Sequence, residues 1–510
     1  MRLRFTVLTE FIDPLNNRDF DVLIIGAGIA GIGGAWHLKR DCPDKSYAIL
    51  EARDRIGGTW DLFRYPGVRS DSDMFTLGYG FHPWSDAKVI ADGPAIRRYV
   101  KDIARKYDID REIRFGSRVV RADWSSDEAR WHLMVDKAGE EQRYTCRMLF
   151  LGAGYYNYEA GFTPKFDGIE NFQGDILHPQ KWPADYDYSD KRVIVIGSGA
   201  TAITLVPSMA DKAAHVTMLQ RSPTYVASMP SHSPLAGFLN QVLPSKLTYS
   251  IMRWQRIILQ QLLFKYVRAF PKQAKRNLIK KVKDGLPSEF DVETHFTPRY
   301  NPWDERLCLV PDDDYYIALK NGDASIVTGH IDHINKNGIL LKNGEQLDAD
   351  LIVTATGLNL QVFGGAEICV DGVPVQSQDT FSYRGIMNSD VPNLVSVFGY
   401  TNASWTLRSD LIAEYFCRII NFMEEKGYVS VTPVPSDSAM PTQPFTDFSS
   451  GYFKRAEAIL PKTGPGPWNH PQDYAKDVRA LRHGSLEDGE LIFATGGQAE
   501  QAANKSMAAE

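Results

Sequence analysis

Two distant stretches of this 510-residue chain repeat one pattern, in which a short apolar run is followed by a glycine-rich turn and then by apolar residues at helical spacing. The first apolar run is Asp21–Ile25 and the second is Arg192–Ile196. A strand, a glycine turn and a helix in this order form the unit that binds a dinucleotide at the edge of a parallel sheet. The sequence therefore predicts an α/β fold with two doubly wound, Rossmann-like dinucleotide-binding domains.

The first glycine turn has the spacing G-x-G-x-x-G. Gly26 permits the tight turn, Gly28 lets the backbone approach a pyrophosphate, and Gly31 lets the helix pack closely on the strand. Phosphates then lie at the helix N-terminus, where N–H groups and the helix dipole favour negative charge. Glu51 ends the next strand, where a carboxylate accepts hydrogen bonds from the ribose of a nucleotide without a 2′-phosphate. A chance cluster of glycines is the alternative, but all these parts stand in register, which favours an FAD site.

The second turn differs at the point that distinguishes NAD from NADP. Its residues are Gly197, Ser198, Gly199, Ala200, Thr201 and Ala202. The next strand, 215–220, is followed by Arg221 and Ser222 rather than by an acid. A guanidinium can hold a 2′-phosphate with two hydrogen bonds, so this turn is predicted to bind NADPH. The alternative interpretation of Arg221 is an ordinary surface arginine.

A loop rich in glycine, proline and aromatic residues, 57–71, follows the strand of Glu51 and ends in Asp71. Such a loop can be shaped around a flat ligand, or its aromatic side chains can simply fill the edge of the domain. By itself the loop supports both interpretations equally. Its position beside the predicted FAD site favours the first, because binding residues concentrate on loops that a rigid scaffold positions.

Composition argues against several other classes of protein. A net charge of -6 provides no basic face for a nucleic acid. The five cysteines contain no C-x-x-C pair, which argues against a dithiol centre, a metal site or a secreted disulfide framework and fits a reducing cytoplasm. The uncharged segments 22–38 and 193–210 are glycine-rich and shorter than the ~20 apolar residues that a bilayer span requires.

Long helical spacing replaces the alternating pattern between residues 236 and 285. The apolar residues that share one predicted helix face are Ile257, Ile258, Leu262, Leu263 and Tyr266, and a basic stretch follows at 272–283. The favoured interpretation is a helical insertion with a solvated charged face. A basic amphipathic helix can also lie on a membrane surface, so peripheral membrane association remains the alternative.

These patterns divide the chain into parts that alternate between the two predicted domains. The expected parts are an N-terminal extension (1–18), the FAD-binding domain (19–155), the NADP-binding domain (156–225), the helical insertion (226–298), the second part of the NADP-binding domain (299–347), the second part of the FAD-binding domain (348–493) and a disordered tail (494–510).

Two further motifs link the chain to a known family. Residues 172–183 read F-x-G-x-x-x-H-x-x-x-W-P, and residues 58–71 read G-x-W-x-x-x-x-Y-P-G-x-x-x-D. Both resemble, without a gap, the type I Baeyer–Villiger monooxygenases of the flavin-containing monooxygenase superfamily, and the resemblance covers about residues 19–490. Within this family the chain is most similar to the ethionamide monooxygenase branch, through the runs 59–65, 300–303 and 400–406.

The resemblance implies an enzyme that uses FAD, NADPH and O2. A peroxide at the flavin C4a carbon would insert one oxygen atom next to a ketone carbonyl to give an ester or lactone, with S-oxygenation of sulfides or thioamides as a side activity. An anionic nucleophile calls for a fixed positive charge. The resemblance places that charge at Arg306, held in position by Asp71; the alternative is a structural arginine paired with Asp304 or Asp312. Glu305 stands where the family has a lysine that helps to hold the NADP phosphate.

The resemblance and the two glycine turns together give the expected cofactor residues. Those for FAD are Gly26, Gly28, Ala30, Gly31, Glu51, Thr59, Trp60, Asp61, Leu62, Asp71 and Val119. Those for NADP are Arg69, Ser70, Gly197, Ser198, Gly199, Ala200, Thr201, Ala202, Arg221 and Ser222.

Other functions are weaker alternatives. A flavin monooxygenase that acts only on nitrogen or sulfur centres is the first. A disulfide reductase or electron-transfer flavoprotein would have the same two turns, but no paired cysteines are present; a nucleotide sensor would not need Arg306. The resemblance places His178 at a hinge between domains rather than in catalysis. The expected partners are a ketone or organosulfur substrate and O2, whereas the sequence predicts neither the physiological substrate nor the oligomeric state.

Overall fold

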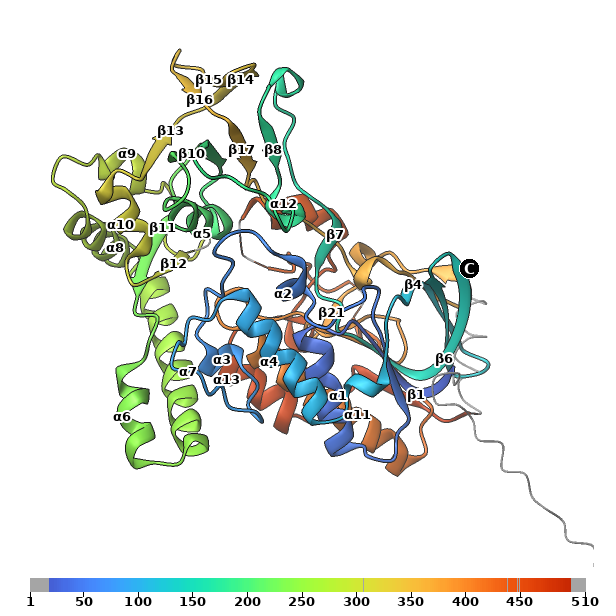
Figure 1. Ribbon diagram of the computed structural model, residues 1–510. Coiled ribbons are helices and arrows are strands. Elements are labelled where there is room, and N and C mark those ends of the chain that lie inside the picture. Colours follow the sequence, from blue (N-terminus) through green and yellow to red (C-terminus); the bar gives the residue numbers. More distant parts are fainter. Residues whose placement is uncertain (1–17, 306, 438, 447, 449, 497–510) are drawn as a thin grey trace, which may run out of the picture.

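The computed structural model describes most of the chain, namely residues 18–305, 307–437, 439–446, 448 and 450–496. The predicted extension 1–18 and tail 494–510 lie almost wholly outside the described residues. Two sheets organise the described part, and a hairpin of one short and one long helix projects from it (Figure 1).

The first sheet joins segments that are far apart in the sequence. Its strands in spatial order are β20 (Val373–Pro374), β19 (Glu367–Val370), β4 (Arg118–Ser125), β5 (Arg130–Lys137), β6 (Glu140–Leu151), β1 (Asp19–Ile25), β2 (Tyr47–Leu50) and β3 (Ile113–Arg114), with β23 (Leu394–Ser396) also paired to β6. The strand β1 runs parallel to β2 and β6, whereas β4, β5 and β6 form an antiparallel meander.

Alternation along β1 explains how this sheet is covered on both faces. Successive residues of a strand point to opposite sides. Val22 and Ile24 pack in the core formed with the helices α1 (Ile29–Asp41), α4 (Gly93–Lys106) and α11 (Trp405–Lys426). Leu23 and Ile25 pack in a separate core with the meander. All four side chains are at most 9% exposed, as expected for a strand that is buried on both faces.

The second sheet is parallel throughout. Its strands in spatial order are β13 (Ala324–Thr328), β10 (His215–Gln220), β9 (Arg192–Ile196), β17 (Leu351–Thr354) and β8 (Asp175–Leu177). Helices α5 (Ala200–Met209) and α10 (Asp314–Asn321) pack on one face, and the strands β14 (Ile331–Asn335), β15 (Gly338–Leu341) and β16 (Gln346–Asp348) cover the other. Because β17 belongs to this sheet, the second part of the predicted NADP-binding domain extends beyond its expected end at residue 347.

The helical insertion is present, but its apolar side is not buried. It contains the helices α6 (Pro234–Val242), α7 (Ser245–Ala269), α8 (Pro271–Gly285) and α9 (Val292–Phe296). The strand β11 (Tyr225–Met229) at its start pairs in parallel with β12 (Leu307–Pro311), which follows it in the chain. Of the predicted apolar face, Ile257 is buried, whereas Ile258, Leu262, Leu263 and Tyr266 are exposed. The spacing therefore identified residues that share a helix, but most of them face away from the core.

Short elements complete the described chain. The strands β7 (Tyr156–Gly161) and β18 (Leu358–Leu360) pair antiparallel where the chain passes between the two sheets. The remaining elements are α2 (Thr59–Leu62), α3 (Met74–Leu77), α12 (Gly451–Ala456), α13 (Tyr474–Asp477), β21 (Ser382–Tyr383), β22 (Met387–Asn388), β24 (Ser430–Pro433) and β25 (Leu491–Ala494). None of the described helices combines the length and the apolar character that crossing a bilayer requires.

Candidate active site

A cavity of about 1770 Å³ extends along both glycine turns. It is larger than the ~300–1,000 Å³ of a usual small-molecule pocket, so it has room for more than one ligand of cofactor size. The predicted cofactor residues that line it are Gly26, Gly28, Ala30, Glu51, Thr59, Trp60, Leu62, Arg69, Ser70, Asp71, Val119, Gly197, Ser198, Gly199, Ala200, Thr201, Arg221 and Ser222. Gly31, Asp61 and Ala202 are described but are not part of the lining.

Gly26 and Gly31 of the first glycine turn have no room for a side chain. A Cβ atom at Gly31 would lie 1.8 Å from the carbonyl oxygen of Gly26, and the φ of Gly26 is +96°. Gly28 is the N-cap of α1, and a Cβ placed there would be 3.5 Å from the backbone of Gly58. Helix α1 therefore begins directly against the turn, which leaves its N-terminal backbone beside the cavity, where a phosphate can be held.

Glu51 is held in place behind this turn. Its carboxylate accepts hydrogen bonds from the backbone N–H groups of Ala27 (2.6 Å) and Arg53 (2.9 Å), and the residue is 6% exposed. Burial raises the pKa of Glu51 above its ordinary value, against those two hydrogen bonds, which lower it. The acid thus lines the cavity with its orientation already fixed.

Asp61 has a supporting position rather than the predicted contact with the cavity. Its buried carboxylate pairs with Arg53, with Arg97 at 2.8 Å and with Arg64 at 3.4 Å. Burial alone would raise the pKa of Asp61, but the hydrogen bond from Arg97 and the charges of Arg53 and Arg64 bring it below its ordinary value. Because Arg53 itself lines the cavity, Asp61 positions a cation there.

The second turn is more open. Gly197 has a φ of +133°, and a Cβ atom there would lie 2.3 Å from the carbonyl oxygen of Ala355. A Cβ at Gly199, in contrast, meets nothing within 4 Å. The hydroxyl of Ser198 donates to the carbonyl of Ser222 at 3.0 Å, which ties the turn to the segment after β10. Arg221 is exposed at the cavity wall, where it can reach a phosphate.

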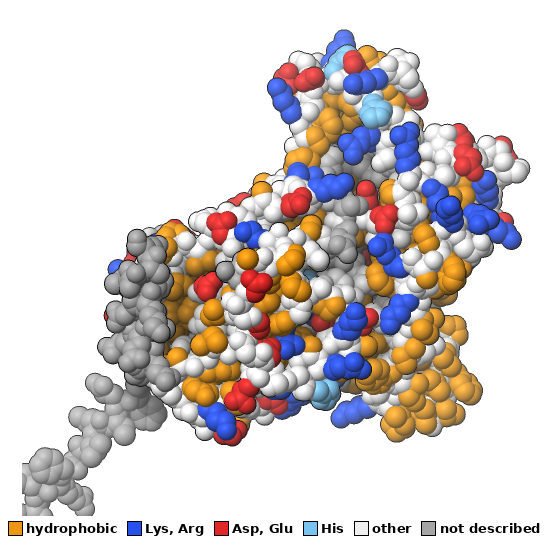
Figure 2. Space-filling view, turned by 180° about the vertical axis from the view of Figure 1, so that it is seen from behind, with side chains coloured by type: hydrophobic (Ala, Val, Ile, Leu, Met, Phe, Trp, Pro, Cys, Tyr) orange, Lys and Arg blue, Asp and Glu red, His pale blue; other side chains and the backbone are white. Residues whose placement is uncertain are grey.

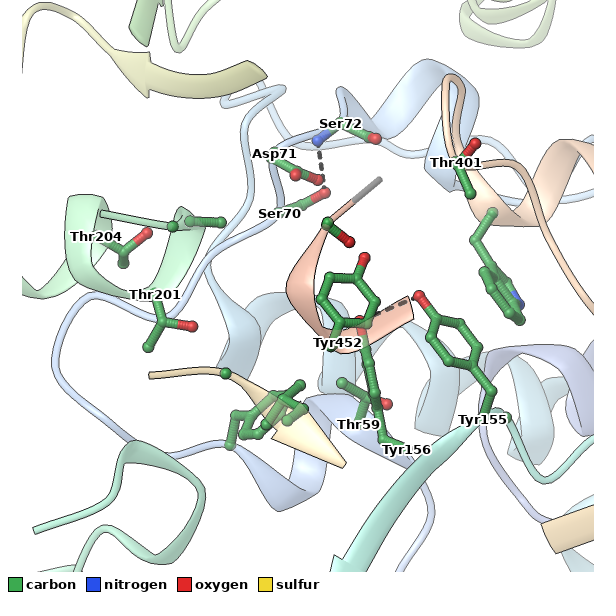
Figure 3. A pocket seen from close by; sticks show the side chains of 18 of the residues that line it. Thr59, Ser70, Asp71, Ser72, Tyr155, Tyr156, Thr201, Thr204, Thr401 and Tyr452 are labelled. Atoms are coloured by element: carbon green, nitrogen blue, oxygen red, sulfur yellow. Dashed lines mark hydrogen bonds between the residues drawn. The ribbon is translucent and has the colours of Figure 1, made fainter. Parts of the chain in front are cut away.

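The loop 57–71 passes between the two turns, and its last residues face the cavity (Figure 3). The hydroxyl of Ser70 accepts a hydrogen bond from the N–H of Ser72 at 2.9 Å, beside Asp71. Arg69 forms an ion pair with Asp314 at the start of α10, so its cation is already engaged across the two domains. The structure thus places the expected NADP residues Arg69 and Ser70, and the expected FAD and catalytic residue Asp71, in the lining of the shared cavity.

The predicted catalytic residue Arg306 lies outside the described residues. Its neighbours Glu305 and Leu307 both line the cavity. Burial raises the pKa of Glu305, opposed by the positive charges of Lys454 and Arg221. Arg221 and Glu305 therefore influence each other at the same wall.

His178 lies apart from this cavity. Its Nε2 hydrogen-bonds the carbonyl of Gly357 at 3.1 Å, and its Nδ1 accepts from the N–H of Gln180 at 3.1 Å, so both ring nitrogens are engaged in a neutral ring. Burial lowers the pKa of His178. A Cβ atom at Gly161 would lie 1.9 Å from the ring, so the ring packs against β7 where the chain passes between domains. These contacts fit the predicted hinge role, which remains a prediction.

An aromatic wall of the cavity escaped sequence analysis. It includes Tyr155, Tyr156, Tyr158, Tyr400, Trp405, Phe448 and Tyr452. The hydroxyls of Tyr155 and Tyr156 are 3.2 Å apart, and Tyr452 faces them from the short helix α12 (Figure 3). These residues come from three separate segments. The run 400–406, which contains Tyr400 and Trp405, served only as evidence of the family resemblance, and nothing in the sequence indicated that it meets the Tyr155-Tyr156 pair.

Comparison with known proteins supports this description. Residues 84–290 match the flavin-binding monooxygenase-like family, and residues 24–103 match an NAD(P)-binding Rossmann-like domain. The FAD-containing monooxygenase EthA of Mycolicibacterium smegmatis is 49% identical over 93% of this chain and 97% of its own length. The putative FAD-containing monooxygenase MymA of Mycobacterium tuberculosis is 47% identical, covering 96% and 100%. An oxidized steroid monooxygenase bound to NADP is a structural neighbour with a TM-score of 0.74 at 22% identity, covering 94% and 100%.

These findings confirm several predictions made from the residues. The two-domain dinucleotide-binding fold, the similarity to ethionamide-type monooxygenases, the flavin-dependent monooxygenase class and the FAD and NADP cofactor pair are all confirmed. The identity to EthA over nearly the whole of both chains is the strongest of these findings. The chain belongs to the family of FAD-containing, flavin-binding monooxygenases.

Proposed function

We propose that this enzyme inserts one oxygen atom of O2 next to a ketone carbonyl, giving an ester or lactone. The reaction balances as ketone, O2, NADPH and H⁺ going to ester, water and NADP⁺. S-oxygenation of sulfides or thioamides would be a side activity. The observation that carries this proposal is the single cavity that both glycine turns share, because oxygenation needs a reductant and a flavin within reach of one substrate.

The residues at the first turn fit FAD. The close packing of Gly31 on Gly26 leaves the N-terminus of α1 beside the cavity. The carboxylate of Glu51 is oriented to accept hydrogen bonds from the ribose hydroxyls. Thr59, Trp60, Leu62 and Val119 would line the flavin side of the cavity. When bound, the flavin supplies hydride acceptance and the activation of O2.

The residues at the second turn fit NADPH. Arg221 and Ser222 lie at the cavity wall after β10, where the 2′-phosphate of the nucleotide would bind. Residues 197–201 would hold its pyrophosphate at the N-terminus of α5, and Arg69 and Ser70 would contact it from the opposite loop.

Arg306 and Asp71 are the proposed catalytic residues. Negative charge develops on the substrate oxygen during the insertion, and a fixed guanidinium stabilises it in a water-poor cavity. Asp71 would orient that guanidinium from the loop 57–71. The aromatic wall around Tyr155, Tyr156 and Tyr452 would exclude water and provide an apolar surface for the substrate.

A panel of aliphatic, cyclic and aryl ketones with NADPH tests the proposal. We expect NADPH-dependent O2 consumption and a product heavier than the ketone by one oxygen atom, with the label of ¹⁸O2 in the ester. A purified flavoprotein that oxidises NADPH yet yields only H2O2 with every ketone would contradict the proposal.

Oxygenation restricted to nitrogen or sulfur is the second candidate. It is favoured by the similarity to EthA-type relatives rather than by a feature of the cavity. A parallel panel of methyl sulfides and thioamides separates the two functions: sulfoxides without any ester from the ketone panel would favour the second candidate.

A further inference from the structure

Exposed large apolar side chains concentrate on one part of the molecule. Among the described residues, those on α6, α7 and the following residue are Leu235, Phe238, Val242, Leu247, Ile251, Trp254, Ile258, Leu259, Leu262, Leu263, Tyr266 and Phe270. Elsewhere in the described chain, the large apolar side chains that are exposed are only those of Ile317, Val373 and Ile492. Figure 2 shows the hydrophobic side chains gathered on the projecting α6–α7 hairpin, at the lower right. A patch of this kind marks an interaction site.

The exposed side chains form continuous stripes along α7. Ile251, Trp254, Ile258 and Leu262 follow one another at intervals of three or four residues, so they share one side of the helix. Phe238 and Val242 extend this surface onto α6, and both are more than 60% exposed. We call this combined surface the apolar hairpin face.

The opposite side of α7 is fixed to the protein. Arg253 donates to the carbonyls of Gly78 (2.7 Å) and Phe75 (2.8 Å) and pairs with Asp410 at 3.4 Å. The hydroxyl of Tyr249 donates to the carbonyl of Tyr79 at 3.1 Å. Because these contacts anchor the helix, the apolar hairpin face is held outward as a rigid surface.

The charges around this face have one sign. Every charged residue between 234 and 283 is a lysine or an arginine, although the whole chain has a net charge of -6. Lys246 at the start of α7 and Lys272, Lys280 and Lys281 on α8 are exposed. An apolar surface bordered by cations matches the boundary of an anionic bilayer, where apolar side chains enter the acyl region and cations contact the headgroups.

We propose that the apolar hairpin face docks on an anionic lipid bilayer. The sequence left membrane association as the alternative for the amphipathic, basic segment between residues 236 and 285. In this proposal α6 and α7 are the inserting element, and the basic helix α8 is their electrostatic support. A second copy of this chain is a less suitable occupant, because two faces bordered by cations repel each other.

Docking would also orient the cavity towards the lipid. Leu259, Leu263 and Tyr266 are at least 40% exposed on this surface, and all three line the cavity. A sparingly soluble substrate could then enter from the bilayer along these side chains. Entry of the substrate from the bilayer rests on the proposed function, whereas docking itself does not.

Vesicle co-sedimentation of the flavin-loaded enzyme tests docking. The test variant is Phe238→Ser/Ile258→Ser/Leu262→Ser, whose positions are exposed and outside the cavity lining. The matched control, Ile317→Ser/Val373→Ser/Ile492→Ser, removes exposed apolar side chains elsewhere. With vesicles of phosphatidylglycerol and phosphatidylcholine, we expect the test variant to bind at least about tenfold more weakly and the control to bind as the wild type does. Pure phosphatidylcholine should bind the wild type more weakly than the mixed vesicles.

Several outcomes would overturn docking. The wild-type protein could stay in solution with both kinds of vesicle, or the test and control variants could lose binding equally. A dimer that dissociates only in the test variant would show that the face binds a second copy instead. Turnover of a long-chain ketone held in the vesicles tests entry of the substrate from the bilayer separately from the proposed function. The test variant should turn it over more slowly while oxidising a short, water-soluble ketone at the wild-type rate. Failure with both ketones in the wild type would count against the proposed function, not against docking.

Discussion

The two glycine turns follow the same backbone plan but differ in how much is fixed around them. At the first turn Gly31 packs on Gly26 without room for a methyl group, and Glu51 is 6% exposed with two backbone N–H groups bound to it. At the second turn Ala202 already occupies the corresponding position, and Arg221 is exposed. The first site is therefore rigid and preorganised, whereas the second is open to solvent.

This difference matches two kinds of nucleotide use. A preorganised site binds tightly because little conformational freedom is lost on binding, which suits a flavin that remains bound through many turnovers. An open site with a solvated cation binds more weakly, which suits a nicotinamide nucleotide that enters and leaves. The structure thus predicts that the same substitution has unequal effects at the two turns.

Adding a methyl group to the first turn should have the largest effect. Gly31→Ala places a Cβ atom 1.8 Å from the Gly26 oxygen, so α1 must move away from the FAD site, and we expect purified protein without flavin colour. Gly199→Ala is the matched control, because nothing lies within 4 Å of its added Cβ, and it should retain flavin. Flavin absorbance per protein, with circular dichroism to confirm folding, measures both. Full flavin content in Gly31→Ala would refute the claimed rigidity.

Replacing Arg306 should stop the oxygenation while leaving both turns intact. We expect Arg306→Ala to reduce ester formation by about 10²–10³-fold, the usual loss when one charge-stabilising donor is removed. Flavin content and anaerobic reduction by NADPH should be unchanged, and Arg306→Lys should recover part of the activity. Stopped-flow flavin reduction and product analysis separate these steps. Wild-type ester turnover in Arg306→Ala would remove Arg306 from the mechanism.

Arg221→Ala should have a moderate effect that is confined to the second turn. Loss of one guanidinium–phosphate contact is expected to raise the KM for NADPH about tenfold, ~1.4 kcal/mol, with little change for NADH. Steady-state kinetics with both nucleotides measures this, and flavin content is the internal control. An unchanged preference for NADPH over NADH would mean that another residue binds the 2′-phosphate.

Acidification should affect the first turn more gently. The pKa of Glu51 in the folded protein lies above its ordinary value of about 4.5. Above this raised pKa the buried negative charge lowers the stability of the folded protein, and protonation at lower pH relieves that cost. Protonation also removes the carboxylate that would accept hydrogen bonds from the ribose hydroxyls. We expect flavin retention to weaken on acidification in the wild type but to be lower and pH-independent in Glu51→Gln. Flavin fluorescence after filtration measures release; identical pH profiles would contradict the role of Glu51.

Much of the cofactor region could be predicted because it depends on local sequence. The expected strand at 21–25 and the helix expected after the glycine turn agree with β1 (Asp19–Ile25) and α1 (Ile29–Asp41), since the glycine turn fixes where the strand ends and the helix begins. The lining residues of both turns followed from the same spacing. The direction of the Asp61 side chain did not, because it depends on ion pairs with Arg53 and Arg64 nearby in the chain and with Arg97 on α4.

Features that depend on distant segments could not be predicted. The aromatic wall is assembled from the segment after β6, from residues near 400 and from α12, and no spacing within one segment indicates that they meet. The strand β17 joined the second sheet through pairing with β8 and β9. On α7, periodicity showed which residues share a side but not whether a partner covers that side, and most of the predicted face is exposed.

The ion pair between Arg69 and Asp314 has a consequence for how salt affects the enzyme. If Arg69 binds the pyrophosphate, as proposed, in place of Asp314, then binding of the nucleotide exchanges one anion for another. Dissolved ions weaken the bond that is broken as well as the one that is made. The affinity for NADP⁺ should therefore fall less steeply with ionic strength in the wild type than in Asp314→Asn, where the guanidinium has no carboxylate to give up; equal slopes by titration calorimetry would show that Arg69 never changes partner.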